Sequence, residues 1–188
     1  MNIKFNTLLF TLLTSSLFAA SPVKNGDFTD AGNNWSGAGK IVTVNDAGES
    51  VMLNGTPAME LTAQKDSFVS CDQSIRLNKG ITKVVITVEA KALPDFKANK
   101  ESRKYSNFGP GWWQWSGLIF PKADFCIRLQ DGWYYYRAVN FAPSNNWQTI
   151  TTTIGKLNPQ AYKKLSLVIC PGEGNVLIRS VKVEESAN

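Results

Sequence analysis

Hydrophobic and polar residues alternate along much of the chain with the period of two that β-strands produce. The clearest example is the segment 83–91, in which every even-numbered residue is apolar and the odd-numbered residues, apart from Val85, are polar or charged. An antiparallel strand with one buried and one exposed face requires this alternation. The same reasoning predicts strands, in chain order, at 40–45, 50–54, 57–63, 67–77, 81–91, 123–130, 133–142, 147–154, 163–170 and 175–184.

The last predicted strand contains a shift in this alternation. Its apolar residues change parity at Arg179-Ser180, between Ile178 and Val181. Helical periodicity is missing, and short strands recur between clusters of Gly, Asn and Pro, which is typical of a β-sandwich or jelly roll. We therefore predict an all-β fold, a jelly-roll β-sandwich of two antiparallel sheets.

One long segment, 93–121, does not follow the alternation. Its first half is basic, and its second half contains Trp112, Trp113 and Trp115. A loop of this length in a compact domain is usually either functional or disordered. Because three indoles within four residues argue against disorder, we predict a long Trp-rich loop insertion that carries a function.

The first twenty residues have the layout of a secretory signal peptide. Lys4 precedes the apolar stretch 8–17, and small residues precede Ser21. The apolar stretch is too short to span a membrane, so no membrane insertion is expected. We predict a signal peptide over 1–20 and one mature domain over 21–188, which is secreted or periplasmic and monomeric. The balance of 20 basic against 15 acidic residues agrees with an anionic glycan as partner, but it is also typical of an ordinary soluble protein.

Composition excludes several kinds of catalytic and metal site. The chain has no His, which excludes a Ser-His-Asp triad, a Cys-His pair and His-based metal sites. Cys71, Cys126 and Cys170 are too far apart for a metal-ligand motif. Cys71 is predicted to be a buried free thiol. Cys126 and Cys170 would form a disulfide if their strands are antiparallel neighbours, and the sequence leaves that question open.

The opening segment 23–28, Val-Lys-Asn-Gly-Asp-Phe, is followed by Trp35. This pattern resembles the first strand of secreted carbohydrate-binding modules with a galactose-binding-like jelly roll. The order of later segments is similar to that family as well, namely 58–61, 73–77, 81–91, 146–150 and 176–183. The resemblance implies that Trp35 and Trp147 are structural. A shared fold does not by itself carry a function.

The resemblance also raises the question of a bound cation. In the family, an Asp in the last strand helps to hold a structural calcium ion near the N-terminus, whereas this chain has Arg179 and Ser180 there. A guanidinium opposes a hard cation, which needs several oxygen ligands. We expect no cofactor. A structural calcium ion with Asp27 as its surviving ligand is the alternative, and Arg179 could instead replace the ion by pairing with Asp27.

Sugar rings present apolar C–H faces surrounded by hydroxyl groups. A binding site therefore needs exposed aromatic rings together with planar donors and acceptors. The candidate rings lie in the long loop and in the strand that follows the Asp131-Gly132 turn: Trp112, Trp113, Trp115, Trp133 and Tyr135. For each of them the alternative is that the ring packs against the sandwich.

Polar side chains on the predicted sheets complete the candidate site. Arg128 and Gln130 share the polar side of their strand, and Glu89 lies on the polar side of the segment 81–91. The resemblance implies that such a face is the concave binding surface. The alternative is a solvated face with surface ion pairs.

Together these features predict a secreted, non-catalytic, lectin-like module that binds a polysaccharide or glycan. One alternative is a small jelly-roll glycosidase or lyase, in which Tyr135, Arg128 and Gln130 could serve a lyase; paired carboxylates for hydrolysis are missing. A second alternative is a protein–protein interaction domain of a secreted assembly, with the Trp-rich loop as its anchor. Nucleic acid is not expected, because the basic residues do not interleave with aromatic ones.

Overall fold

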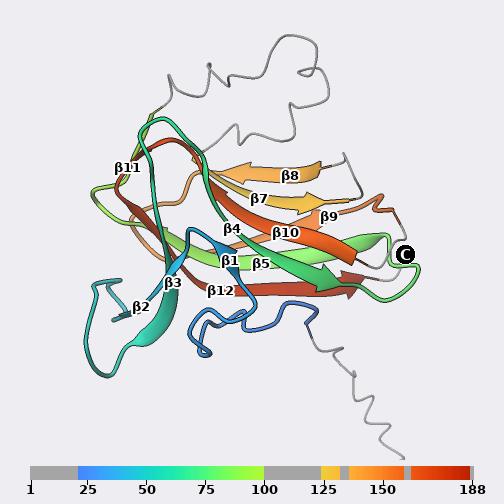
Figure 1. Ribbon diagram of the computed structural model, residues 1–188, viewed down its shortest axis with the longest axis horizontal. Coiled ribbons are helices and arrows are strands. Elements are labelled where there is room, and N and C mark those ends of the chain that lie inside the picture. Colours follow the sequence, from blue (N-terminus) through green and yellow to red (C-terminus); the bar gives the residue numbers. More distant parts are fainter. Residues whose placement is uncertain (1–20, 100–123, 132–135, 159–161, 187–188) are drawn as a thin grey trace, which may run out of the picture.

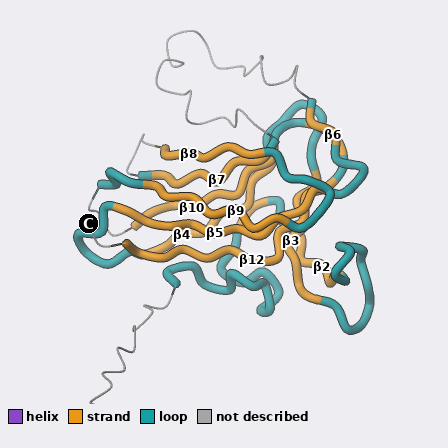
Figure 2. Tube along the Cα trace, turned by 180° about the vertical axis from the view of Figure 1, so that it is seen from behind, coloured by secondary structure: helices purple, strands orange, loops and turns teal. Residues whose placement is uncertain are grey.

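The computed structural model describes residues 21–99, 124–131, 136–158 and 162–186, which form strands, turns and loops (Figures 1 and 2). No described residue lies in a helix. Accordingly, these ranges contain no helix with the length and apolarity needed to cross a membrane.

Two five-stranded sheets face each other in the sandwich (Figure 1). The first sheet has the order β1 (Ser36–Gly37), β4 (Val69–Arg76), β10 (Tyr162–Ile169), β7 (Phe125–Gln130) and β8 (Tyr136–Phe141). The second sheet has the order β2 (Lys40–Val44), β3 (Thr56–Thr62), β12 (Asn175–Ser186), β5 (Lys83–Ala92) and β9 (Gln148–Ile154). A small additional sheet pairs β6 (Lys97–Ala98) with β11 (Gly172–Glu173).

Every strand pair is antiparallel. Along the chain, the connections pass repeatedly from one large sheet to the other, as in a jelly roll. The predicted fold class, an all-β sandwich of two antiparallel sheets, is confirmed.

The core lies between the two sheets and is built from alternate residues of their strands. The even-numbered residues of 83–91 are fully buried, as the alternation predicts. The first sheet contributes the opposite layer, in which Phe125, Ile127, Leu129, Leu165, Leu167 and Ile169 are fully buried. Since burial of one large aliphatic or aromatic side chain stabilises the fold by about 1.5–3 kcal/mol, these two layers supply most of its driving force.

The predicted shift in the last strand is a β-bulge. The pairing of β12 with β5 changes register between Ile178 and Ser180, so that Arg179 is the extra residue. Val181 and Val183 then return to the core at 4% and 0% exposure. The bulge therefore keeps the apolar face of β12 inward along its whole length.

The segment 23–28 closes the open edge of the sandwich next to this bulge. The Val181 amide donates to the Gly26 carbonyl at 2.8 Å, and a β-carbon on Gly26 would clash with the Val181 carbonyl oxygen. Phe28 is fully buried against Trp35, with 5.7 Å between ring centroids, and the Trp35 indole N–H donates to the Asn25 carbonyl at 3.0 Å. Trp35 is half-buried and packs against the core, so this motif has a structural role.

The predicted strand at 50–54 is wrong. Ser50 forms only an isolated bridge with Val44, and the chain then bends away before β3 begins at Thr56. Met52 is fully exposed and Leu53 is 80% exposed, which shows that these apolar residues have no sheet face to pack against. Of the long segment 93–121, residues 93–99 are described and include β6; residues 100–123 lie outside the described residues.

Candidate functional site

The outer side of the first sheet carries two rows of polar side chains. In the first row, Lys164 of β10 lies between Ser74 of β4 and Gln130 of β7. In the second row, Ser166 lies between Asp72 and Arg128 on the same three strands. The residues that alternate with them on β7 and β10 are the buried core residues, so these polar side chains are on the outer side of the sheet, although Ser166 is only 1% exposed there. We call this surface the polar face; its members are Asp72, Ser74, Arg128, Gln130, Lys164 and Ser166.

An exposed aromatic ring lies next to the first row, one step along β10. Tyr162, the first residue of β10, is 68% exposed, and the Arg76 guanidinium carbon lies 5.6 Å from the centroid of its ring. Tyr162 forms a hollow of about 290 Å³ together with Lys163 and with Ser74, Gln130 and Lys164 of the polar face. The hollow thus combines an aromatic ring, a planar amide, a hydroxyl and an ammonium group, which is the set that sugar recognition requires.

Contacts within the polar face hold its charged side chains in place. Lys164 Nζ lies 2.8 Å from Asp72 Oδ2, and one guanidinium nitrogen of Arg128 donates to Ser166 Oγ at 3.5 Å. The Lys164 side chain is 45% exposed, whereas that of Asp72 is only 14% exposed. The ammonium group is therefore held beside the hollow while it stays accessible to a ligand.

The structure brings together only some of the predicted site residues. Arg128 and Gln130 belong to the polar face of the first sheet. Glu89 lies on β5 in the second sheet, on the opposite outer side of the sandwich. A single site that contains Glu89 together with Arg128 and Gln130 is therefore excluded. The five predicted aromatic residues, Trp112, Trp113, Trp115, Trp133 and Tyr135, lie outside the described residues.

Glu89 instead has a structural role on the second sheet. Its carboxylate accepts a hydrogen bond from the Arg179 guanidinium at 2.5 Å, and that guanidinium stacks over the Trp147 ring at 4.5 Å. This hydrogen bond, followed by the Coulomb attraction of the same carboxylate, raises the pKa of Arg179 above its ordinary value. The expectation that Arg179 pairs with Asp27 is wrong, because the bulge directs Arg179 to the outer side of the sheet.

The turn before the predicted strand at 50–54 covers part of this outer side. The Trp147 indole N–H donates to the Asp46 carbonyl at 3.0 Å, and the Lys91 ammonium group donates to the Ala47 carbonyl. Lys91 is buried, although its parity predicts an exposed residue. Trp147 is half-buried against a small apolar cluster around Val44, Ala58 and Leu177. This side of the second sheet is therefore occupied by the protein's own side chains.

The surroundings of Asp27 do not fit a structural calcium ion. Asp27 is exposed, and its Oδ1 accepts hydrogen bonds from the Thr29 amide and hydroxyl group at 3.3 and 3.0 Å. The described ranges contain no group of three or more His, Cys, Asp or Glu side chains that could hold a metal ion. Calcium requires six to eight oxygen ligands, and the described side chains at Asp27 supply too few.

The three cysteines are buried and are not joined by a disulfide. The alternative of a Cys126–Cys170 disulfide is therefore wrong, and the free thiol predicted for Cys71 is confirmed. Burial raises the pKa of the Cys71 thiol to about 11, because the thiolate would lose its hydration. Cys126 shares the outward parity of the polar face yet is only 1% exposed.

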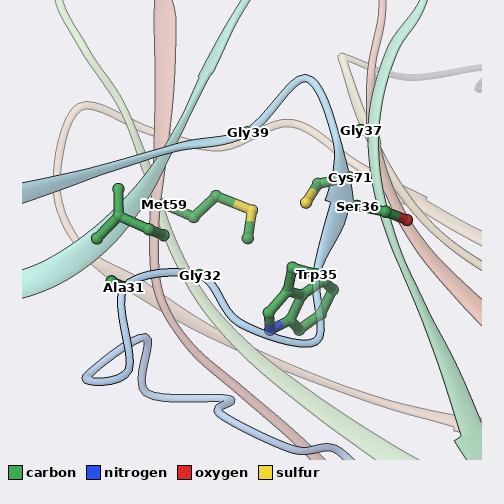
Figure 3. A pocket seen from close by; sticks show the side chains of 9 residues that line it. Ala31, Gly32, Trp35, Ser36, Gly37, Gly39, Met59 and Cys71 are labelled. Carbon is green, nitrogen blue, oxygen red and sulfur yellow. The ribbon is translucent and has the colours of Figure 1, made fainter.

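A second hollow, of about 430 Å³, lies between the loop 31–39 and the sheets (Figure 3). The Trp35 ring, the Met59 thioether and the Cys71 thiol line it. The remaining wall consists of glycines at 32, 37 and 39 together with Ala31, Ser36 and Ile41. Sequence reasoning did not find this hollow, because Met59 and Cys71 are far apart along the chain and each has the pattern of a core residue.

Sequence reasoning also missed Tyr162, Ser74 and Lys164. Tyr162 precedes the strand predicted at 163–170, so nothing in the alternation marked it as part of a sheet surface. Ser74 and Lys164 are ordinary polar residues until strand pairing places them beside Gln130. The available signal was an aromatic residue next to two lysines at the start of a strand, which is too common to identify a site.

Comparison with known proteins identifies likenesses of fold. No family model matches the sequence, and no curated protein matches it. The solved structure of TmCBM61 in complex with β-1,4-galactotriose aligns with a TM-score of 0.59 and 14% identity over 89% of this chain and 100% of that chain. A family 16 carbohydrate-binding module aligns with a TM-score of 0.52 and 14% identity over 86% of this chain and 98% of that chain.

An enzyme-associated structure is similar as well. The enzymatically active domain of tailspike protein 4 from bacteriophage CBA120 aligns with a TM-score of 0.56 and 12% identity over 88% of this chain but only 21% of that chain. Identities this low show a shared fold. They agree with the jelly-roll sandwich described above.

Proposed function

We propose that this chain is a non-catalytic carbohydrate-binding domain whose ligand lies on the polar face beside Tyr162. The observation that carries the proposal is the exposed Tyr162 ring at the edge of a hollow lined by Ser74, Gln130 and Lys164. The fold supports it, because solved carbohydrate-binding modules share this fold, including one in complex with β-1,4-galactotriose.

The residues around the hollow can contact both the apolar face of a sugar ring and the hydroxyl groups at its edge. The C–H face of a pyranose packs on the flat side of an aromatic ring, and Tyr162 offers such a side to solvent. The Gln130 amide can donate to one hydroxyl group and accept from its neighbour, and the Ser74 hydroxyl group can do either. Lys164 supplies donors for a hydroxyl group or for a carboxylate of an acidic sugar.

The order of residues along β10 gives the ligand a direction. Tyr162 comes two residues before Lys164, whose row of Ser74 and Gln130 is the first that a saccharide stacked on Tyr162 meets along the strand. The next row is less accessible, because Ser166 is only 1% exposed and the Asp72 side chain 14% exposed. The proposed contacts are therefore those of Tyr162 and the first row.

The enzyme alternative lacks a free pair of acids on the described polar face. Hydrolysis of a glycosidic bond uses two carboxyl groups on either side of the bond. Asp72, in the second row, is ion-paired with Lys164 at 2.8 Å and is mostly buried, so it is poorly placed to exchange protons with a ligand. The lyase alternative rests on Tyr135, which lies outside the described residues.

Affinity electrophoresis against neutral and acidic polysaccharides, with a β-1,4-galactan included, tests the proposal. The best ligand is then measured by isothermal titration. Tyr162→Ala should weaken binding about tenfold, because ring stacking of this kind is worth roughly 1.4 kcal/mol. Leu53→Ala, which removes an exposed apolar side chain far from the polar face, is the matched control and should leave the affinity unchanged.

Three results would contradict the proposal. One is the absence of binding to every polysaccharide on the panel. Another is a folded Tyr162→Ala variant that binds as tightly as the wild-type protein. The third is a loss of polymer viscosity on incubation with the protein, which would establish an enzyme. Export of the domain through the apolar segment 8–17 is also proposed, and mass spectrometry of the extracellular protein would reveal cleavage after Ala20.

A further inference from the structure

Two sulfur atoms meet at the second hollow. The Met59 thioether, from β3, and the Cys71 thiol, from β4, point toward each other above the Trp35 ring (Figure 3). Met59 and Cys71 are only 1% and 2% exposed, so bulk water does not surround either sulfur. The geometry therefore places two soft donor atoms and one aromatic ring around the same small volume.

Gly39 packs closely against both sulfurs. A β-carbon built on Gly39 would lie 2.9 Å from Met59 Sδ and 3.1 Å from Cys71 Sγ. The sulfurs thus cannot be farther apart than those two distances added together. An ion whose bonds to sulfur are about 2.3 Å long bridges about 4.6 Å, and the flexible Met59 side chain can adjust to that span.

The donor set selects one class of ion. Thiolate and thioether ligands favour soft ions such as Cu(I), whereas hard cations require carboxylate or carbonyl oxygens. None of the described side chains that line this hollow is a His, Asp or Glu. Burial raises the pKa of the Cys71 thiol to about 11, and backbone hydrogen bonds from Gly39 and Asp72 offset only part of that rise, so a bound ion has to displace the thiol proton.

We propose that Met59 and Cys71 bind a single soft monovalent metal ion of the Cu(I) and Ag(I) class, with the Trp35 ring along the open side of the ion. Binding forms one bond from the Cys71 sulfur and one from the Met59 sulfur. The Cys71 thiol loses its proton to solvent in the same step, and no electron is transferred. This site lies outside the polar face and does not depend on the proposed glycan function.

Silver ion is the probe, since Ag(I) needs no reductant. The full chain with Cys126→Ala and Cys170→Ala provides the background, so that Cys71 is the remaining thiol. Native mass spectrometry in chloride-free buffer should show one Ag⁺ per chain, and competition with a thioether chelator gives the affinity. A weakly buffered solution with a pH indicator should report release of about one proton per ion.

Three variants separate a metal site from ordinary sulfur packing. Cys71→Ala should abolish binding. Met59→Leu keeps an apolar side chain of similar size and should weaken the affinity at least tenfold. Gly39→Ala retains both sulfurs but puts a methyl group between them, so it should also weaken the affinity at least tenfold. Gly155→Ala is the matched glycine control, because its β-carbon would meet nothing closer than 4.0 Å, and it should leave the affinity unchanged.

Protection from alkylation gives a second measurement if a variant is poorly stable. Bound Ag⁺ should slow the reaction of Cys71 with iodoacetamide at least tenfold in the wild-type chain, with no protection of Cys126 and Cys170. The proposal is overturned if folded Met59→Leu and Gly39→Ala bind Ag⁺ as tightly as the background protein. Equal protection of all three cysteines would overturn it too, because it would show that Ag⁺ reacts with any thiol of the chain.

Discussion

The Arg179 guanidinium stacks on the Trp147 ring at 4.5 Å and at the same time binds the Glu89 carboxylate at 2.5 Å. Arg179 is the bulged residue of β12, Glu89 belongs to β5, and Trp147 holds the turn at Asp46 through its indole N–H. One side chain therefore joins the bulge, the neighbouring strand and the turn that covers the second sheet. This is a clamp on the side of the sandwich opposite the polar face.

Arg179→Ala should lower the free energy of unfolding by about 1–2 kcal/mol. The loss combines a cation–π contact of about 0.5–1 kcal/mol with an ion pair that is partly screened by solvent. Arg179→Lys keeps the charge but not the planar stack, so it should recover less than half of the loss. Urea unfolding measures both variants. A change below about 0.3 kcal/mol for Arg179→Ala would contradict the clamp.

Lys164→Ala should weaken glycan binding about fivefold, because it removes one charged donor from the hollow. Lys182 provides a matched control on the second sheet: it pairs with Glu184 at 2.6 Å and its side chain is 56% exposed, against 2.8 Å and 45% for Lys164 with Asp72. Both substitutions should change stability by less than about 1 kcal/mol. Isothermal titration measures the affinity of both variants. Equal affinities for Lys164→Ala and Lys182→Ala would show that Lys164 does not contact the glycan.

Lys163→Met should destabilise the fold by about 3–5 kcal/mol, because it leaves the buried Asp131 carboxylate without its counter-charge. Lys163 Nζ lies 2.9 Å from Asp131 Oδ1 and also donates to the Asn158 carbonyl at 2.8 Å, and both side chains are buried. The double variant Lys163→Met/Asp131→Asn should be more stable than Lys163→Met alone. Chemical denaturation of the three proteins decides this, and simple additivity of the two substitutions would refute the coupling.

Stability should fall as the pH rises from about 9 toward 11, and Cys71 should account for part of the fall. Its pKa is about 11 in the folded protein against 9.0 for an ordinary thiol, so between these values the unfolded chain binds fewer protons than the folded one. Below pH 9 the thiol is protonated in both states, and the stabilisation that it contributes is fully present. Above pH 11 this stabilisation, roughly 2–3 kcal/mol, is lost. Urea unfolding of Cys71→Ala should show a shallower decline with pH than the wild-type protein. Parallel declines would contradict this assignment.

The sequence predicted the fold well wherever one face of a strand is buried. The alternation in 83–91 and the shift at Arg179-Ser180 both appear in the structure. Every second residue of these strands faces the core and has to be apolar, so the sequence itself shows which face is buried. The prediction failed at 50–54, where Met52 and Leu53 are apolar without facing the core. Hydrophobicity alone does not show whether a segment has a partner strand.

The site was predicted less completely, because a surface depends on which strands are neighbours. Gln130 and Arg128 have the right parity, but parity does not show that Glu89 lies on the other sheet. The hollow beside Tyr162 needs β10 to lie between β4 and β7, and these strands are far apart in the sequence. The Trp-rich segment at 112–115 stays a prediction, since it lies outside the described residues.

The hydrogen-bonded contact between segment 23–28 and β12 next to its bulge has a consequence for folding during synthesis. The Val181 amide binds the Gly26 carbonyl, and the Val183 amide binds Ser21 Oγ at 3.1 Å. The earliest described residues thus acquire their position only after residue 183 has left the ribosome. Contacts of such long sequence separation slow folding. A nascent chain stalled before position 181 would lack these two hydrogen bonds. Its N-terminal segment would then stay undocked and accessible to chaperones and proteases.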